Sequence, residues 1–200
     1  MEKDRDLTFK KASLAEILKE GSVVVIPTDT LPALATLPKY AYKIWEIKRR
    51  PFKKSLILMG ASSKDLFKEI FPSSLQDASL ISNQYWPGAL TMVLPASGKW
   101  VSSLNKQEES IGLRVPNCQQ TLELLELTGP LATTSANISG ESPLKTPKEI
   151  ARAFPGLAIL GPLPWPAQSG LASTVIYWQG ENNWKVLRSG EVTFYNNHEK

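Results

Sequence analysis

Short, continuous apolar runs recur along the chain and are separated by longer stretches in which apolar residues appear at helical spacing. Continuous runs of this length are typical of strands buried on both faces of a sheet. They occupy residues 22–27, 55–60, 89–95 and 130–135. Residues 110–116 alternate between apolar and small or polar side chains instead, which predicts a strand with one wetter face.

The stretches between these runs predict helices. The first begins at a capping box formed by Ser13 and Glu16 and ends at Gly21. The second covers residues 40–47 and carries Ile47 on its apolar face. The other predicted helices cover residues 64–70, 75–85, 117–127 with Asn117 as the cap, and 146–153 with Thr146 at the N-cap and Pro147 at the first helical position.

The last part of the chain predicts a loop and a hairpin. Residues 155–170 are rich in proline and glycine, which predicts a loop over the surface. Residues 173–178 and 184–190 predict the two strands of a β-hairpin. Strands and helices alternate and the chain closes on strands, so we expect one α/β domain over residues 1–200, a mixed sheet with flanking helices.

Cysteine and histidine each occur once, and this removes several kinds of chemistry. Cys118 alone can form neither an intrachain disulfide nor a Cys-cluster metal site. It is predicted at a helix start, where a thiolate is favoured, but no histidine is placed to pair with it. The single histidine, His198, lies near the C-terminus. Catalysis would therefore rest on Lys, Arg, Ser, Thr, Asn and carboxylates, by positioning and charge neutralisation.

The overall charge is mildly basic. The net charge is +4 and the pI is near 9.1, which fits an anionic ligand but is too small an excess to indicate DNA binding by itself. No apolar run is long enough to span a membrane, and the polar start MEKDRDLTFKK lacks the apolar core of a signal peptide. These features predict a cytoplasmic protein without a membrane partner.

Five cations gather in the segment KRRPFKK, residues 48–54. Pro51 keeps this segment out of a regular helix, and like charges packed so closely repel one another unless they are solvated or face an anion. One reading is a solvated helix end, where cations also suit the helix dipole. The other reading is a phosphate-binding wall, and the segment alone does not decide between them.

A second candidate lies after a predicted buried strand, in the loop Ser135 to Gly140. Its small hydroxyl and amide side chains, with a glycine for close approach, suit a phosphate or ribose cradle or equally an ordinary turn. Arg114 lies within a predicted strand, where an unpaired charge is costly, so it requires a carboxylate from the protein or from a ligand. Arg188 is placed similarly in the last strand.

The sequence lacks two common signs of nucleotide or nucleic-acid binding. The sequence contains neither GxxxxGK[ST] nor GxGxxG, so it carries no P-loop and no Rossmann fingerprint. Its six tryptophans are scattered and are interpreted as core and loop packing rather than as platforms for base stacking.

Taken in order, the segments resemble the YrdC family of threonylcarbamoyl-AMP synthases over about residues 21–192. The pieces that carry the resemblance are PTDT (27–30), KRRPFKKSL (48–56), WPGALTMVL (86–94), LRVP (113–116), TTSANISGESP (133–143), STV (173–175) and LRSG (187–190). Each piece is weak alone, and the ordered set is specific.

The resemblance implies a fold and a reaction. The fold is the YrdC-like twisted mixed sheet with flanking helices and a basic concave cavity. The reaction joins L-threonine, bicarbonate or CO2, and ATP with Mg2+ into threonylcarbamoyl-AMP, which serves the modification of adenosine 37 in tRNA. The implied partners are tRNA or double-stranded RNA and the proteins that transfer the threonylcarbamoyl group onward.

The resemblance also assigns roles to individual residues of this sequence. Lys48 and Arg50 would be the catalytic cations. The ATP-binding set would be Arg50, Lys54, Ser110, Ser135, Asn137 and Arg188, and the threonine-binding set would be Thr30, Arg114 and Ser173. No residue is assigned to bind a metal.

The sequence departs from the family pattern mainly where threonine would bind. The usual aromatic and glycine of PT[DE]TVYGL are Pro32 and Ala33, the usual proline of KPL is Ser55, and a frequent histidine is replaced near Met59. The alternative reading is therefore a family paralogue that binds nucleotide or structured RNA without making this product.

Overall fold

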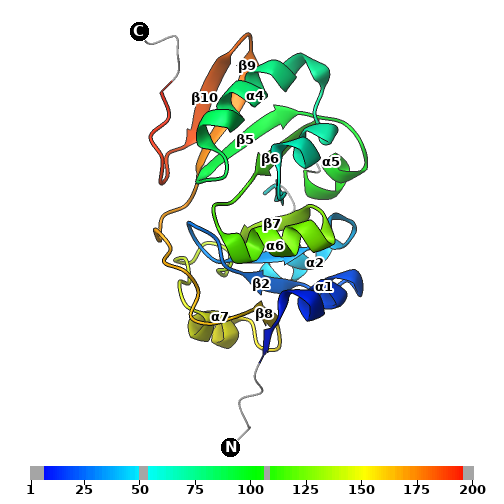
Figure 1. The fold of residues 1–200 in the computed structure, drawn as a ribbon, viewed down its shortest axis with the longest axis vertical. Helices are drawn as coiled ribbons and strands as arrows, with labels where there is room; N and C mark the ends of the chain where they lie inside the picture. Colours follow the sequence, from blue (N-terminus) through cyan, green and yellow to red (C-terminus); the bar gives the residue numbers. More distant parts are fainter. Residues whose placement is uncertain (1–6, 50–53, 106–108, 196–200) are drawn as a thin grey trace, which may run out of the picture.

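The computed structural model describes residues 7–49, 54–105 and 109–195, and their strands form one sheet (Figure 1). In chain order the described elements are β1 (Thr8–Phe9), α1 (Lys11–Lys19), β2 (Val24–Ile26), β3 (Ala33–Thr36), η1 (Pro38–Tyr40), α2 (Tyr42–Lys48), β4 (Ile57–Met59), α3 (Ser63–Leu66), η2 (Phe67–Glu69), α4 (Pro72–Tyr85), β5 (Leu90–Pro95), α5 (Lys99–Leu104), β6 (Ser110–Arg114), α6 (Gln119–Thr128), β7 (Leu131–Ser135), α7 (Pro147–Ala153), β8 (Ala158–Leu160), β9 (Thr174–Gly180) and β10 (Asn183–Arg188).

The sheet is mixed, as the sequence predicts. Its strand order is β1-β8-β2-β3-β7-β4-β6-β5-β9-β10. The pairs β1/β8, β2/β8, β4/β6 and β5/β9 run parallel, and the other neighbours run antiparallel. Strands far apart in the sequence therefore lie side by side, and β4, β6 and β7 form the middle of the sheet.

Helices α1 and α6 cover part of one face of the sheet. Leu14 and Leu18 of α1 are buried with Leu124 and Leu125 of α6 against β2, β3 and β8. Figure 1 shows these two helices on the near side of the sheet. Because side chains alternate along a strand, the other residues of the same strands face the opposite side.

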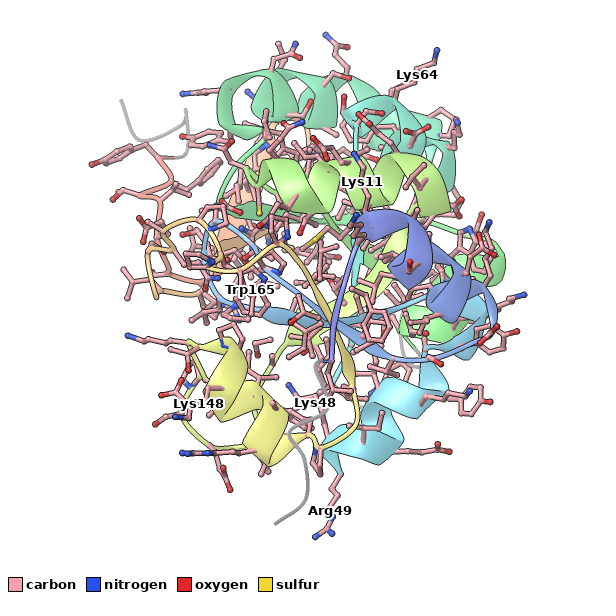
Figure 2. The ribbon with its side chains drawn as sticks, turned by 60° about the horizontal axis from the view of Figure 1, so that its bottom comes forward. Lys11, Lys48, Arg49, Lys64, Lys148 and Trp165 are labelled. Carbon is pink, nitrogen blue, oxygen red and sulfur yellow. The ribbon has the colours of Figure 1, made fainter. Side chains whose placement is uncertain are left out.

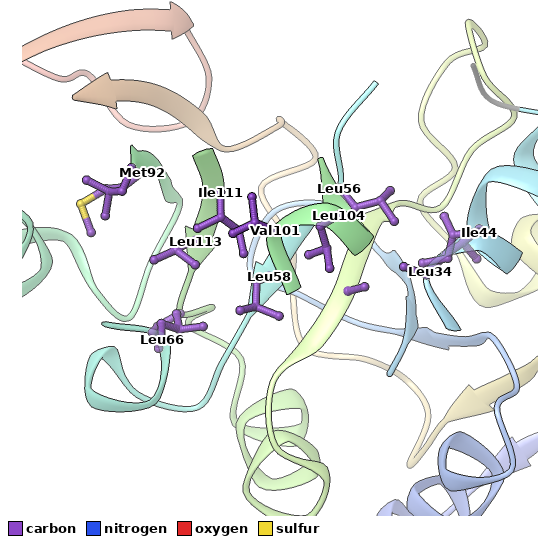
Figure 3. Close-up of a cluster of buried hydrophobic side chains, with 14 of the residues drawn as sticks. Leu34, Ile44, Leu56, Leu58, Leu66, Met92, Val101, Leu104, Ile111 and Leu113 are labelled. Atoms are coloured by element: carbon purple, nitrogen blue, oxygen red, sulfur yellow. The ribbon is translucent and has the colours of Figure 1, made fainter. Parts of the chain in front are cut away.

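The opposite face carries the larger core. Leu58 of β4 and Leu113 of β6 lie in one buried cluster with Leu66 of α3, and Val101 and Leu104 of α5 close over them. Figure 3 shows these side chains gathered around Leu58. This face is filled by leucine, isoleucine and valine, whereas β6 places Ser110, Gly112 and Arg114 on the other face.

The structure confirms most of the predicted elements. The four apolar runs contain β2, β4, β5 and β7, and the alternating segment contains β6. Thr146 caps α7 in a full capping box with Glu149. The predicted hairpin is β9 and β10, joined through Glu181 and Asn182, which both have positive φ angles.

Three predicted details are wrong. The first helix begins at Lys11 with Lys10 as its N-cap, so Ser13 and Glu16 form no capping box. The N-cap of α6 is Cys118 rather than Asn117. In α2 the buried face consists of Ile44, Trp45 and Lys48, while Ile47 is 38% exposed. Helical spacing alone allows either face to be buried. The face with Ile44 and Trp45 is buried because these side chains join the larger core, together with Leu56 and Val25.

Three strands and one α-helix were not predicted. β3 consists of ALAT, whose small residues carry a weak strand signal, and it forms only because β2 and β7 pair with it on both sides. β8 lies inside residues 155–170, which the proline and glycine content predicts to be a surface loop, but its AIL segment is buried between β1 and β2. The short strand β1 and helix α5 were also missed.

The tryptophans act mainly as packing residues, as the sequence predicts. Of the six, Trp45 and Trp184 are buried, and the others pack partly against the larger core. Among the described residues, none of the helices has the length and apolarity needed to cross a membrane.

Gly21 and Gly98 form a matched pair for testing the packing at the end of α1. Both have positive φ angles, but a Cβ on Gly21 would lie 2.8 Å from the Tyr40 ring, whereas a Cβ on Gly98 would meet nothing within 4 Å. We expect Gly98→Ala to lower the free energy of unfolding by about 1–3 kcal/mol, the cost of a backbone conformation that is essentially confined to glycine, and Gly21→Ala to lower it further because of the ring contact. Urea denaturation measures both, and equal losses would contradict the ring contact.

Candidate functional site

A cavity of about 480 Å³ lies on the face of the sheet that α1 and α6 leave partly uncovered. Its floor consists of alternate residues of the central strands, because alternate side chains of a strand share a face. These floor residues are Thr133 and Ser135 of β7, Ile57 and Met59 of β4, Ser110, Gly112 and Arg114 of β6, and Thr91 and Val93 of β5. The wetter face predicted for residues 110–116 is this cavity floor.

Gly112 lies at the centre of the floor. It is opposite Ile57 on one side and Val93 on the other. A Cβ on Gly112 would lie 3.5 to 3.9 Å from the side chains of Ile57, Thr91 and Val93, which is ordinary van der Waals contact. A methyl group at this position would therefore enter the cavity without straining the strand.

Arg114 is the buried charge of the site and is only 5% exposed. Its Nη2 donates to Asp29 Oδ1 at 2.7 Å, its Nη1 to Thr30 Oγ1 at 2.9 Å, and its Nε to the Gly88 carbonyl at 3.1 Å. Burial lowers the pKa of Arg114, and the Asp29 carboxylate opposes that shift. The carboxylate that Arg114 was predicted to require is thus supplied by the protein itself.

The loop between β2 and β3 brings Thr30 to Arg114 across β7 and β4, which separate β3 from β6 in the sheet. Hydrogen bonds hold this loop: the Thr121 hydroxyl donates to the Pro27 carbonyl at 2.6 Å, and the Ala136 N–H donates to the Pro32 carbonyl at 2.8 Å. Ala33 is the first residue of β3 and pairs with Ser135. The departures at Pro32 and Ala33 are therefore compatible with the local backbone.

Ser173 and Arg188 form the opposite wall of the cavity. The Ser173 hydroxyl is buried and lies 2.9 Å from the hydroxyl of Thr91. Arg188 Nη2 donates to the Ser173 carbonyl at 2.8 Å and to the Ser173 hydroxyl at 3.2 Å. The Arg188 side chain is exposed and lines the cavity, so its charge can reach a ligand there.

Lys48 is the one predicted catalytic cation that the described residues include, and it lies next to the cavity rather than in its lining. It is 1% exposed, and its Nζ donates to the Ser135 carbonyl and, at 3.2 Å, to Asn137 Oδ1. The Ser135 hydroxyl donates to the same Asn137 oxygen at 2.6 Å. Figure 2 shows Lys48 inside the molecule, whereas the neighbouring Arg49 projects outward from the end of α2.

The structure thus gathers most of the predicted site residues. Thr30, Ser110, Arg114, Ser135, Ser173 and Arg188 all line the one cavity. Asn137 adjoins it through Ser135, and its amide nitrogen donates to the carbonyls of Ile138 and Glu141, which shapes the loop. The Lys54 side chain is exposed, and Arg50 lies outside the described residues together with Pro51 and Lys53.

Several residues in or beside the cavity were not predicted. Asp29 stands inside the PTDT segment, and the need of Arg114 for a carboxylate was the signal that could have identified it. Thr91 is the one hydroxyl within the apolar run of β5, and this polar interruption was a signal of the same kind. Gly112 gave no signal, because a glycine in a strand pattern has several explanations.

The thiol of Cys118 does not take part in this site. The residue is buried, and burial raises the pKa of its thiol, so the thiolate predicted from its place at a helix start is disfavoured. Among the described residues, no group of three His, Cys, Asp or Glu side chains is arranged to hold a metal ion.

A second hollow of about 1890 Å³ lies beside α7 and adjoins the first. Its lining includes Lys145, Lys148, Arg152 and Trp165, and none of the described residues that line it is acidic. The segment 168–173 separates the two hollows, since Gln168 and Gly170 line the second and Ala172 and Ser173 line the first.

A twisted mixed sheet with a buried arginine, a second arginine and several hydroxyls around one cavity defines an α/β protein with a polar cavity that two cationic side chains line. The family model of the Sua5/YciO/YrdC domain, described as "Telomere recombination", matches residues 16–190. The chain therefore belongs to the Sua5/YciO/YrdC family.

Curated relatives are similar over most of the chain. The threonylcarbamoyl-AMP synthase of Klebsiella pneumoniae is 33% identical over 148 residues, covering 72% of this chain and 78% of the relative. The synthase of the same name from Blochmanniella floridana is 36% identical over 145 residues, covering 69% of this chain and 76% of the relative.

Solved structures share the fold. The Pyrococcus abyssi Sua5 structure complexed with L-threonine has a TM-score of 0.82 and 28% identity and covers 92% of this chain, but this chain spans only 56% of that one. The Escherichia coli YciO structure has a TM-score of 0.77 and 23% identity, covering 92% of this chain and 95% of that one, which shows the fold alone.

Proposed function

We propose that this chain is a nucleotidyltransferase that makes threonylcarbamoyl-AMP from L-threonine, bicarbonate or CO2, and ATP, for the modification of adenosine 37 in tRNA. Relatives that bear the name of this synthase, and the Sua5 structure complexed with L-threonine, support the proposal. The observation that carries it is the cavity in which Arg114 and Arg188 stand with Thr30 and Ser173.

The cavity suits two anionic ligands held side by side. We assign the threonine carboxylate to Arg114, which retains one N–H on each terminal nitrogen beyond its contacts with Asp29, Thr30 and Gly88. Ser173 would face the same ligand. We assign ATP to the side of Ser110, Ser135 and Arg188, with Lys48, Asn137, Arg50 and Lys54 as further members of that wall.

The chemistry then requires positioning and charge neutralisation. Threonine and bicarbonate give an N-carboxylate with loss of water, and an oxygen of this carbamate attacks the α-phosphorus of ATP. The bond from the α-phosphorus to the bridging oxygen breaks, and pyrophosphate leaves with the electron pair. Cationic side chains stabilise the charge that develops on the phosphates without themselves exchanging a proton.

Magnesium would accompany the nucleotide. Since the described residues supply no carboxylate cluster for a metal, and Asp29 is engaged by Arg114, we propose that Mg2+ enters on the phosphate oxygens of ATP. The chain's own contribution is the shaped cavity and its cations.

A pyrophosphate-release assay with a cavity-filling variant tests this proposal. With ATP, Mg2+ and bicarbonate, the wild-type chain should release pyrophosphate only when L-threonine is added. Gly112→Leu should lower kcat/KM by at least roughly tenfold, because a misplaced methylene group in a pocket already costs about this much, while Gly112→Ala, which adds one methyl group to the same backbone, should lose less.

The controls separate folding from binding. Gly112→Ala should unfold at a temperature close to that of the wild type, since its added Cβ meets neighbours at ordinary distances. Thermal unfolding of Gly112→Leu then shows whether its loss of activity comes with a loss of stability. Release of pyrophosphate that does not depend on threonine, under conditions in which a family synthase works, would overturn the proposed activity. Full activity of Gly112→Leu would instead place the reaction outside this cavity.

A second candidate function is RNA binding, and the hollow beside α7 favours it. Three exposed cations line that hollow without an acidic side chain among its described lining residues. Trp165 also lines the hollow, and its indole N–H is already engaged, since it donates to the Leu160 carbonyl at 2.7 Å. Cations beside an aromatic face suit a single-stranded or looped nucleic acid.

Fluorescence anisotropy with a short labelled oligouridylate tests this second candidate. Three neutralised phosphates predict that log K falls against log salt with a slope of about −2, at about −0.7 for each contact. Lys148→Ala with Arg152→Ala should reduce that slope by about two thirds. Lys11→Ala with Lys64→Ala removes the same charge from α1 and α3, as Figure 2 shows, and should leave most of the slope. Equal effects of the two double variants would exclude the hollow as the binding site.

A further inference from the structure

In the loop between β2 and β3, the contacts of Thr28 determine which hydroxyl groups donate and which accept hydrogen bonds. The Thr28 hydroxyl donates to the Leu31 carbonyl at 2.7 Å. A hydroxyl carries one proton, so the Thr28 oxygen can act only as an acceptor toward its other neighbours. It accepts from the Thr30 N–H at 3.1 Å and lies 3.0 Å from the Thr30 hydroxyl oxygen.

The use of the Thr28 proton decides which way the hydroxyl of Thr30 donates its own proton. Because the Thr28 proton is used on Leu31, the Thr30 hydroxyl must be the donor in the contact between the two hydroxyls. The Thr30 oxygen also accepts an N–H from Arg114 at 2.9 Å. Its proton and one lone pair are then used, and a single lone pair is left for a ligand.

Burial makes this arrangement strict. Thr28 and Thr30 are each 2% exposed, so water has little access to reorient either hydroxyl. Both residues line the cavity beside Arg114, whereas Asp29 holds the guanidinium from outside the cavity lining. Toward the cavity, Arg114 is therefore a hydrogen-bond donor and Thr30 is an acceptor. Arg114 Nη1 and Thr30 Oγ1 lie only 2.9 Å apart.

This pair of groups has a chemical complement. A carboxylate on Arg114 places the substituent of its α-carbon next to Thr30. In an α-amino acid that substituent is nitrogen, which carries N–H donors both as the free amine and as the carbamate. A hydroxyl that could rotate would suit an acceptor or a donor equally, but one held by Thr28 suits only a donor.

We infer that Thr28 is a positioning residue: by fixing the proton of Thr30, it makes the cavity select a carboxylate with an adjacent N–H. The inference rests on the proposed function, because it takes L-threonine as the ligand. It adds a role for a side chain that reaches the ligand only through its neighbour.

Calorimetric binding of L-threonine and of (R)-3-hydroxybutyrate, which is threonine without its amino group, tests the inference without catalysis. The wild-type chain should bind threonine at least roughly tenfold more tightly, because the second ligand leaves the buried Thr30 acceptor unsatisfied. Thr28→Val has nearly the same shape but frees the Thr30 hydroxyl to turn, so the ratio should fall to within about threefold. Thr28→Ser keeps the hydroxyl and should restore the ratio.

The outcomes distinguish this inference from the proposed function. Failure of the wild-type chain to bind threonine would overturn both. Threonine binding with an unchanged ratio in Thr28→Val, or an equal loss in Thr28→Ser, would overturn the positioning role alone. A wild-type ratio near one would do the same even where Thr28→Val does not fold. In steady-state kinetics Thr28→Val should raise the KM for threonine and leave the KM for ATP unchanged, which a general loss of stability would not do.

Discussion

The buried charge of Arg114 is the constraint on which the site depends. An ion this deeply buried is stable only when its hydrogen-bonding groups are matched, and removal of one partner of a buried pair typically costs about 3–5 kcal/mol. Arg114 meets this requirement with groups from two separate loops, since Asp29 and Thr30 come from the turn after β2 and the Gly88 carbonyl comes from the turn before β5. The same three contacts fix the turn after β2 over the sheet and aim the guanidinium into the cavity. In the proposed function, the same interaction would therefore serve both the folding of this region and the recognition of the ligand.

Much of this arrangement could be predicted from the sequence, and the exceptions have physical causes. The buried strands and the hairpin were predictable because their apolar runs and turn residues are local signals. β3 and β8 were not, because ALAT and AIL are short and become strands only through partners on both sides. The fold brings six of the residues expected from the resemblance to one cavity, while the roles assigned to them stay predictions: Thr30, Ser110, Arg114, Ser135, Ser173 and Arg188. Asp29 and Gly112 were missed, because the role of each depends on strands that are distant in the sequence.

The fold explains how the residues that depart from the family pattern are accommodated. Pro32 and Ala33 lie where the turn after β2 becomes β3, and an extended backbone accepts both residues. Met59 joins the apolar core under α6 and also lines the cavity, where it pairs with Arg114 in the sheet, so an apolar side chain stands next to the buried charge. In the proposed function, the hydroxyls of Thr30 and Ser173 would orient a small polar ligand beside Arg114, with Thr28 and Thr91 as their hydrogen-bond neighbours.

A double-mutant cycle between Asp29 and Arg114, measured by urea unfolding, tests whether their ion pair organises the site. Asp29→Ala and Arg114→Met should each lower the free energy of unfolding strongly, by about 3 kcal/mol or more. The double variant should lose at least about 2 kcal/mol less than the sum of the two single losses, because no unpaired charge then remains buried. Losses that add to within about 0.5 kcal/mol would show that the two residues are not coupled, and would contradict the view that their ion pair organises the site.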